Sequence, residues 1–485
     1  MIRREKALGP VLVLVTASLA LIGSVGAPLM YTISEEMHVT LSAAQWTLTV
    51  TILVGAVTAP VLGRLGDGRH RRPAMIIGLL VVTLGGVVAA MAPGLGMIIV
   101  GRAMQGLGLG IMPLAMAAAR DHMPRERAHS TIALLSVSMV AGTAIGYPVS
   151  GLMEHAFGLA GAYWLGAITS ALALICVVLV VPASTARANA SLDVPGALLL
   201  AAGLVSLLLG IGQANTWGWS SPAIIALLAG AALLLTAWVF QQLRATEPLV
   251  NLRLLRHPAV MTANVCAMIL GVTMYMFFTA VLDFVQAPPA AGYGFAATVT
   301  VAGLCVVPMS VTSIAVSRML PWLTTHLGTH NLIPLGSLTI AAAGVFFTFA
   351  HDTVWQTMTM MAIIGVGFGL TSAVMPGLIV RAVPDRETGS ALGFYQVVRN
   401  IGLALGSALA GLIIAGHTPT GAPWPLESAY TVVLLAGAGI CVLAATFAWA
   451  VPGSPVDENV VEDDFAVENA ELGPVGLVGL PDKTP

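Results

Sequence analysis

Long apolar runs separated by short polar connections follow one another along almost the whole chain. A helix needs about 20 predominantly apolar residues to cross the hydrocarbon core of a bilayer. Runs of this length occur near 11–31, 44–63, 74–92, 95–118, 131–153, 161–181, 194–212, 222–240, 259–284, 296–317, 332–350, 355–378, 389–415 and 428–450. The pattern predicts an all-α membrane protein with 14 spans.

The positive charges fall on one side of this layout. Of the 20 Lys and Arg residues, all except Arg102 and Arg399 lie in alternate connections, beginning with the N-terminal segment. Cytoplasmic connections retain Lys and Arg, so this asymmetry sets the orientation of the helices. We therefore expect both the N- and the C-terminus in the cytoplasm. The alternation also supports the span count, because one extra span would scatter the charges onto both sides.

The composition agrees with this layout. Hydrophobic residues make up 57% of the chain and charged residues only 9%, whereas soluble domains carry about 25% charged residues. Lipid must therefore surround most of the surface, and we expect a multi-pass protein of the cell membrane. The net charge of −2 indicates no nucleic-acid partner. The four cysteines lie in apolar runs without metal-ligand spacing, so no metal site is expected.

A set of glycines and one proline recurs in the two parts of the chain. Pro124, Gly142, Gly146 and Gly151 recur at one constant offset as Pro384, Gly402, Gly406 and Gly411. Parallel repeats of this kind are a transporter architecture, with the substrate site between the halves near the membrane midplane. We expect a six-helix bundle at 1–190, two further helices and an amphipathic cytoplasmic linker at 191–257, a second six-helix bundle at 258–452, and a disordered acidic tail at 453–485.

The connection after the second run is short and strongly basic. It resembles the signature loop of the major facilitator superfamily, Gly-x-Leu-Ala-Asp-Arg-x-Gly-Arg-Arg, which it matches at Gly63, Leu65, Asp67, Arg71 and Arg72. The resemblance implies the major facilitator fold, two six-helix bundles, here with two extra central helices. It also implies that Asp67 docks on a helix N-terminus of the other half, near Gly389 or Ser390, and latches the outward-open state. A carboxylate gains about 0.3–1 kcal/mol at such a position. The alternative is a solvated turn whose basic residues only fix the topology.

Arg102 lies inside the fourth run, where a mid-helix Arg costs about 2.5–3.5 kcal/mol on insertion scales. Such a residue faces a cavity or a partner rather than lipid. The segment from Arg102 through Gln105 to Gly108 resembles a motif of proton-coupled members of the same superfamily. The resemblance implies that Arg102 and Gln105 take part in proton coupling. The alternative is a structural hydrogen-bond donor between helices.

The fifth run carries a glycine pattern that resembles the antiporter motif Gly-x-x-x-Gly-Pro-x-x-Gly-Gly. Gly142, Gly146 and Gly151 match this motif, whereas Pro148 stands one place late and Tyr147 occupies the proline position. In antiporters the motif forms a pliant, closely packed helix that is associated with export. A proline inside a helix removes one backbone hydrogen bond and kinks the helix.

Further features narrow the resemblance to the fourteen-helix drug:proton antiporters. Many of these proteins carry an Asp in the first helix, but aligning on Pro28 puts Leu19 at that position. Asp283 is then the acid that lies within a span, and we name it as a second candidate for proton coupling; the alternative is a solvated acid at the interface. Arg399 and the adjacent Asn400 either contact an anionic substrate or cap a neighbouring helix.

These observations predict a transporter that exports a small organic molecule in exchange for protons. The resemblance implies a drug or an antibiotic as substrate, including a toxic metabolite that the cell itself makes. The proton motive force supplies the energy, so no cofactor is expected, and the protein is expected to be a monomer. A proton-coupled importer of a small nutrient is the first alternative. The second, a membrane enzyme or receptor, is disfavoured because no span carries a catalytic or metal-binding cluster.

Overall fold

The computed structural model describes residues 2–25, 29–39, 41–183, 193–384, 387–419 and 424–451. All regular structure in these residues is helical, without strands, as expected where lipid offers the backbone no hydrogen-bond partners. The predicted acidic tail at 453–485 and the predicted boundary between residues 190 and 191 lie outside this part of the chain.

The helices fall into two groups with a hairpin between them. The first half consists of α1 (Ile2–Ser24), α2 (Met30–Glu36), α3 (Leu41–Gly66), α4 (Arg71–Ala90), α5 (Leu95–Gly106), the 3-10 turn η1 (Leu107–Gly110), α6 (Ile111–His122) and α7 (Arg125–Val180). The hairpin and its linker consist of α8 (Val194–Trp217), α9 (Pro222–Arg244) and η2 (Leu252–Arg256). The second half consists of α10 (Pro258–Gln286), η3 (Pro289–Ala291), α11 (Val299–Leu327), α12 (Thr329–Phe347), α13 (Val354–Ala382), α14 (Thr388–Gly416) and α15 (Glu427–Ala450).

In the described residues, 13 helices are long and apolar enough to cross a membrane. The predicted runs at 131–153 and 161–181 both fall within α7, which makes the number of spans 13 or 14 according to how α7 is divided. The backbone leaves the helical conformation at Gly158, with φ 69° and ψ −175°, a region that glycine adopts readily. The predicted run at 95–118 is interrupted by η1, where the chain tightens into a 3-10 turn between α5 and α6.

The repeated glycines occupy equivalent places in the two halves. Gly142 and Gly146 on α7 pack against α1, the first helix of the first half. Gly402 and Gly406 on α14 pack against α10, the first helix of the second half, so closely that a Cβ on either would overlap a carbonyl oxygen of α10. Small residues let membrane helices approach in this way. The recurrence in the sequence therefore corresponds to a recurring helix pair.

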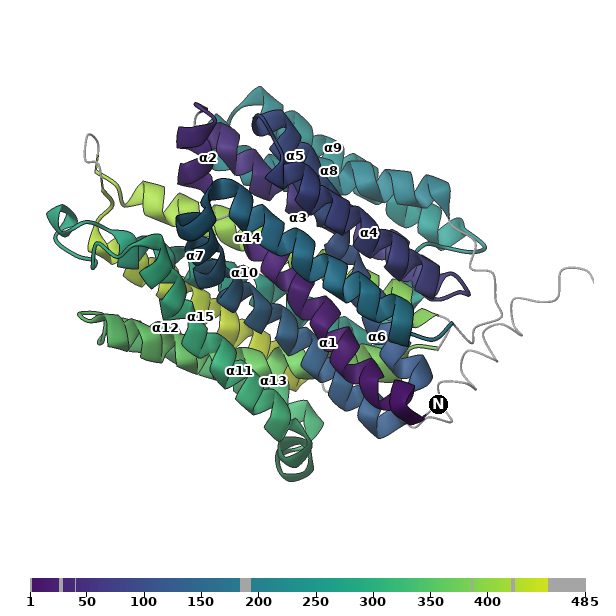
Figure 1. Ribbon diagram of the computed structural model, residues 1–485. Coiled ribbons are helices and arrows are strands. Elements are labelled where there is room, and N and C mark those ends of the chain that lie inside the picture. The colour runs from purple at the N-terminus through teal and green to yellow at the C-terminus, as the bar shows by residue number, and fades with distance from the viewer. Residues whose placement is uncertain are drawn as a thin grey trace, which may run out of the picture.

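The hairpin of α8 and α9 lies across the seam between the halves. α8 packs against α3 of the first half and against α14 of the second half. A buried cluster joins Trp238 of α9 and Leu249 and Val250 of the linker to Val397 of α14. In Figure 1 the two helices lie at the edge of the bundle, where α8 packs on α3 and α9 packs on α8.

The α3–α4 connection, the linker after α9 and the α13–α14 connection meet at one end of the bundle. We call this the Asp67 end. α1 begins at the same end (Figure 1). α10 begins there too, so it runs from the Asp67 end to the opposite end of the bundle.

Candidate functional site

Asp67 lies in the short connection between α3 and α4, and its side chain is only 4% exposed. Its carboxylate accepts hydrogen bonds from the backbone N–H of Gly389, through Oδ1, and from that of Ser390, through Oδ2 at 2.9 Å. Both donors belong to the first turn of α14, where backbone N–H groups have no acceptor within the helix. The helix dipole also favours a carboxylate here. Asp67 thus joins the first half to the second.

Two glycines make this contact possible. α3 and α14 approach so closely that a Cβ on Gly63 would overlap the carbonyl oxygen of Gly389, and a Cβ on Gly389 would overlap that of Gly63. One turn further along α14, a Cβ on Gly393 would lie 2.7 Å from the carbonyl oxygen of Ala59. A larger side chain at Gly63 would therefore hold the helices apart and separate Asp67 from its two donors.

The two arginines of the signature loop bind groups of the first half. Arg71 is 3% exposed and donates from Nε to the carbonyl oxygen of Gly66 at 2.6 Å. It also forms an ion pair with Asp121 at the end of α6. Arg72 donates to the carbonyl oxygen of Val178 at 2.8 Å. Arg71 therefore ties the end of α3 to α6, and Arg72 ties α4 to the end of α7.

The environment of Asp67 shifts the pKa of its carboxyl group. Burial raises the pKa of Asp67 from 3.8 to about 7, because the loss of hydration disfavours the charged form. The backbone N–H groups of Ser390 and Gly389 and the charge of Arg64 act in the opposite direction, but their effect is smaller. The contact between the halves therefore contains a carboxyl group that titrates near neutral pH.

Further side chains connect the halves at the Asp67 end and were not singled out from the sequence. Arg120 of α6 bonds to the hydroxyl of Thr388 and donates to the carbonyl oxygen of Val383 at 3.2 Å. Asn251 of the linker donates to the carboxylate of Glu387 at 3.2 Å. The Arg120–Thr388 and Asn251–Glu387 pairs span 268 and 136 residues along the chain. No local pattern marks partners this far apart.

Arg102 is completely buried in α5. Its guanidinium donates to the carbonyl oxygens of Ile22 at 2.9 Å and Thr47 at 3.2 Å, and to the side-chain oxygen of Gln105 at 3.0 Å. Its Nη2 and the hydroxyl of Tyr163 are buried without a hydrogen-bond partner among the described residues. Arg102 thus joins α5 to α1 and α3, and the structure places Gln105 beside it.

The residues of the antiporter-type pattern on α7 divide between two neighbouring helices. Gly142 and Gly146 face α1, as described above. Pro148 and Gly151 face α11 of the second half, where a Cβ on Gly303 would lie 3.1 Å from the backbone nitrogen of Pro148. α7 therefore packs closely on both halves, and this pattern lies where they meet.

Arg399 and Asn400 lie on different faces of α14. Arg399 is half-buried beside a small cavity between α10, α13 and α14, and it donates to the side-chain oxygen of Gln396 at 3.5 Å. Asn400 is buried two turns beyond Gly393, so it shares the face of α14 that packs on α3. The two neighbours are therefore not parts of one cluster.

Asp283 lies three residues before the end of α10, near the end of the bundle opposite Asp67, and its side chain is exposed. It belongs to the second half, whereas Arg102 is bound to helices of the first half. Of the three residues predicted for proton coupling, Arg102 and Gln105 therefore lie together, and Asp283 occupies a separate part of the molecule.

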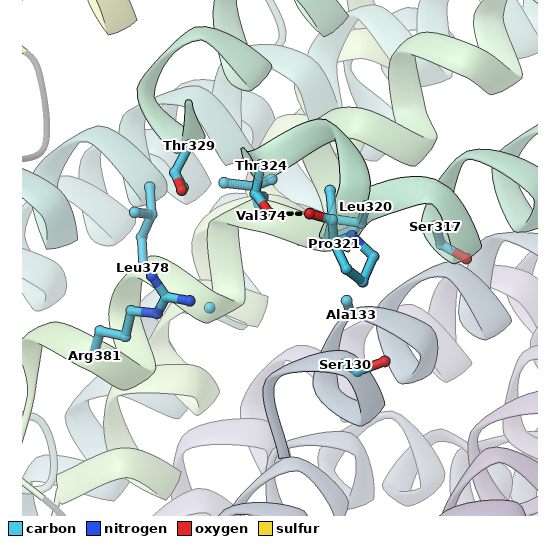
Figure 2. Close-up of a pocket in the computed structure, with 12 residues that line it drawn as sticks. Ser130, Ala133, Ser317, Leu320, Pro321, Thr324, Thr329, Val374, Leu378 and Arg381 are labelled. Atoms are coloured by element: carbon cyan, nitrogen blue, oxygen red, sulfur yellow. Dashed lines mark hydrogen bonds between the residues drawn. The ribbon is translucent and has the colours of Figure 1, made fainter. Parts of the chain in front are cut away.

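A cavity of about 280 Å³ lies between the halves near the Asp67 end. Figure 2 shows Ser130 and Ala133 of α7 on one side of it and Pro321 and Thr324 of α11 on another, with Arg381 of α13 reaching toward it. Its walls carry more apolar than polar surface. No motif in the sequence marks this cavity.

The whole chain resembles known transporters. The sequence profile of the Major Facilitator Superfamily matches residues 12–407 and 270–474. The tetracenomycin C resistance and export protein of Streptomyces glaucescens is 25% identical over 394 residues, which cover 79% of this chain and 71% of that protein. The cephamycin export protein CmcT of Amycolatopsis lactamdurans is 29% identical over 404 residues, 80% of each chain.

Solved structures share the fold. The human organic anion transporter MFSD10 superposes with a TM-score of 0.63 at 13% identity, covering 92% of this chain and 99% of that one. The proton:xylose symporter XylE also gives a TM-score of 0.63, at 15% identity, covering 93% of this chain and 96% of that one. At such low identity these structures establish the arrangement of the helices alone. With the profile match over most of its length, the chain belongs to the Major Facilitator Superfamily.

Proposed function

We propose that this transporter exports a small organic molecule, of the drug or antibiotic type, in exchange for protons. The relatives that export tetracenomycin C and cephamycin favour export over import. They also favour a role in self-resistance, in which a cell expels a toxic compound of its own making. The family is generally non-enzymatic, which weighs against the membrane enzyme among the alternatives.

The contact between Asp67 and the first turn of α14 is the observation that best supports a transport cycle. It closes the Asp67 end of the seam between the halves. Transporters of this architecture work by rocking one half against the other. We propose that the contact is the latch of the state that is closed at this end, with Gly63 permitting the close approach and Arg71 and Arg72 holding the loop in place.

We assign proton coupling to Arg102, Gln105 and Asp283. Arg102 places a fixed positive charge inside the first half. Such a charge raises the free energy of a second positive charge nearby, and so of a proton bound beside it. Asp283 is an acid that lies within a span, near the opposite end of α10. We expect Asp283→Asn to alter the pH dependence of transport measured in energised vesicles. An unaltered profile would exclude Asp283 as a carrier.

The proton motive force is sufficient for this exchange. One elementary charge that crosses 100 mV releases about 2.3 kcal/mol. A tenfold gradient of the exported compound costs about 1.4 kcal/mol. One proton can therefore support a gradient of more than tenfold. We further propose 14 spans, with α7 counted as two on either side of Gly158, a monomer, a location in the cell membrane and both chain ends in the cytoplasm.

A growth-inhibition panel tests the proposal. The chain is expressed in a host that lacks its own efflux pumps, and the inhibitory concentrations of structurally diverse antibiotics are measured with and without a proton uncoupler. We expect resistance to at least one compound to rise and the uncoupler to abolish the rise. Increased sensitivity, together with proton-dependent accumulation of the compound, would instead support the nutrient-importer alternative. No change for any compound would contradict drug export.

A further inference from the structure

Two helix pairs join the halves along their length. α3 packs on α14, and α7 packs on α11. Among the described residues, the hairpin of α8 and α9 packs on the first pair and on neither helix of the second. The cavity of about 280 Å³ lies at the second pair, with Ser130 and Ala133 of α7 on one side and Pro321 and Thr324 of α11 on another (Figure 2). A molecule in this cavity would therefore touch both halves.

The lining of the cavity changes with depth from polar to mostly apolar. Thr329 begins α12, Arg381 is the last residue but one of α13, and Thr324 lies three residues before the end of α11. These side chains form a rim at the Asp67 end of the bundle. Ala133 and Ala373 lie eight and nine residues from the ends of their helices, which is about 12–14 Å deeper. A polar rim above apolar walls suits an amphiphilic molecule.

The rim favours a negatively charged group. Arg381 is exposed, and its guanidinium reaches toward the cavity (Figure 2). None of the residues that the structure places around the cavity is acidic. The hydroxyls of Ser130 and Thr329 form no hydrogen bond within the described part of the chain. α12 also begins at the rim, and the first N–H groups of a helix have no acceptor within it and carry a partial positive charge.

The surface beside the cavity has the character of a membrane interface. On α11, Arg318 and Trp322 flank the lining residues and are exposed. The indole of Trp322 stacks on the ring of His326, with 4.5 Å between the ring centroids. On α7, Arg127 is exposed one turn before Ser130. Trp is enriched at the level of the lipid headgroups, and Arg residues near the membrane surface attract anionic lipids.

We infer that an anionic phospholipid binds in this cavity, with its phosphate at Arg381 and its glycerol part against the apolar walls, and that it stabilises the state closed at the Asp67 end. Basic pockets between membrane helices on the cytoplasmic side bind lipid headgroups, and the proposed orientation places the Asp67 end on that side. The chains of the lipid lie outside the cavity, on the exposed apolar side of α11 near Met319 and Trp322. The inference does not depend on which compound is exported.

The volume and the lining favour a lipid over the exported compound. Sites that enclose most of a drug-sized ligand measure about 300–1,000 Å³. At about 280 Å³ the cavity falls short of this range, whereas a headgroup needs less room because its chains remain outside. Since both halves contribute lining residues, rocking the halves apart would separate the walls of the site. A lipid that binds only the closed state shifts the equilibrium toward closure.

Lipid binding to the purified full-length protein tests the inference. Phosphatidylglycerol and phosphatidylcholine are titrated separately in detergent, and the lipid-bound fraction is measured by native mass spectrometry. We expect one site that binds phosphatidylglycerol about tenfold more tightly than phosphatidylcholine, which corresponds to about 1.4 kcal/mol. Arg381→Gln should remove this preference, and Arg381→Lys, which keeps the charge, should retain most of it.

A second variant probes the cavity without changing a charge. A Cβ at Gly377 would meet no atom within 4 Å, so Gly377→Leu should fill the cavity without displacing its neighbours and should weaken the binding of phosphatidylglycerol. Gly439→Leu adds the same side chain at an equally open position of α15 and should leave binding unchanged. Arg253→Gln, at an exposed position of the linker, is the matched control for the loss of charge.

Several outcomes would overturn the lipid site. Equal binding of the two lipids, or an unchanged affinity for phosphatidylglycerol in Arg381→Gln or in Gly377→Leu, would each contradict it. Equally tight binding of glycerol 3-phosphate, which has no chains, would assign the cavity to a soluble phosphate compound instead. Displacement of phosphatidylglycerol by a compound that the antibiotic panel identifies would assign the cavity to the transported compound.

The stabilisation of the closed state is tested in nanodiscs of either lipid. Spin labels at Arg69 and Arg256, exposed positions at the Asp67 end, report the distance between the halves. We expect a larger closed fraction in phosphatidylglycerol than in phosphatidylcholine for the wild type and for Arg253→Gln, and no difference for Arg381→Gln. A wild-type closed fraction that is independent of the lipid would refute the stabilisation. These measurements need no transported compound, so the antibiotic panel tests the export proposal separately.

Discussion

Asp67 combines two opposing effects in one side chain. Two backbone N–H groups of α14 favour its charged form, but burial disfavours that form more strongly and raises its pKa to about 7. In the open state the carboxyl group is hydrated, and its pKa returns toward 3.8. The closed state therefore binds a proton more tightly than the open state does. By linkage, closure is favoured when pH falls below about 7 and disfavoured as pH rises through that value.

The direction of this pH dependence gives a prediction for Asp67→Asn. The amide does not titrate, and its NH2 group cannot accept the second of the two backbone hydrogen bonds. We therefore expect the closed fraction of the variant to be independent of pH and proton-driven efflux to be lost. Spin labels at Arg69 and His330, both exposed, would report the distance between the halves. The wild-type closed fraction should increase from pH 8 to pH 5, and that of the variant should stay constant. A wild-type distance distribution that is independent of pH would contradict the argument.

Arg102 allows a second test at the residue scale. Replacement by Ala removes the donor of the carbonyl oxygen of Ile22 and of the side-chain oxygen of Gln105, and each buried polar group left unpaired costs about 1–3 kcal/mol. The carbonyl oxygen of Thr47 keeps its hydrogen bond from the hydroxyl of Thr51. We expect Arg102→Ala to abolish proton-driven efflux without stopping membrane insertion. Arg102→Lys keeps the charge but not the planar fork, so its efflux should be partly retained.

Two assays distinguish coupling from a purely structural role of Arg102. Substrate binding is measured on the purified variant, and proton release on substrate addition is followed with a pH-sensitive dye. Coupling predicts that binding persists while proton release is lost. Loss of both in equal measure, with a lowered Tm, would assign Arg102 to structure alone.

At the scale of elements, the linker after α9 bridges the two halves beside Asp67. Glu247 lies 3.9 Å from Arg64 of α3, and Asn251 bonds to Glu387 just before α14. Between these polar ties, Leu249 is fully buried in the cluster that also contains Val397. Exposed ion pairs contribute about 0–1 kcal/mol, whereas a buried Leu→Ala change costs about 2–5 kcal/mol. The apolar contact should therefore dominate the bridge.

We predict that Leu249→Ala shifts the equilibrium toward opening at the Asp67 end, with a smaller closed fraction in the spin-label measurement. Glu247→Gln should change this fraction little. Arg253→Ala, in the same linker but exposed, serves as the control. Equal effects of Glu247→Gln and Leu249→Ala would contradict the dominance of the buried cluster.

The sequence predicted the helices well because an apolar run of about 20 residues has few alternatives in lipid. It did not predict the turn η1, since such a local backbone change depends on the neighbours that a helix packs against. The break at Gly158 falls in the predicted gap between the runs at 131–153 and 161–181. The first turn of α14 could be named as the partner of Asp67 because a family motif identified it. The pairing of Arg120 with Thr388 follows no motif and required the tertiary structure. The direction of Arg399 likewise depends on how α14 is rotated against α10.

At the scale of the whole molecule, the connections of the Asp67 end carry the positive charges, among them Arg69, Arg72 and Arg253. Cytoplasmic loops retain such residues, so we predict that this end faces the cytoplasm. Single cysteines at Arg69 and at Glu36, exposed at opposite ends of the bundle, would be introduced after replacement of Cys176, Cys266, Cys305 and Cys441. A membrane-impermeant maleimide should label position 36 in intact cells and position 69 only in inverted vesicles. The reverse pattern would contradict the predicted orientation of the helices. Labelling of both positions from outside would mean that an even number of spans, and not the single span α3, separates them, which would contradict the proposal of 14 spans.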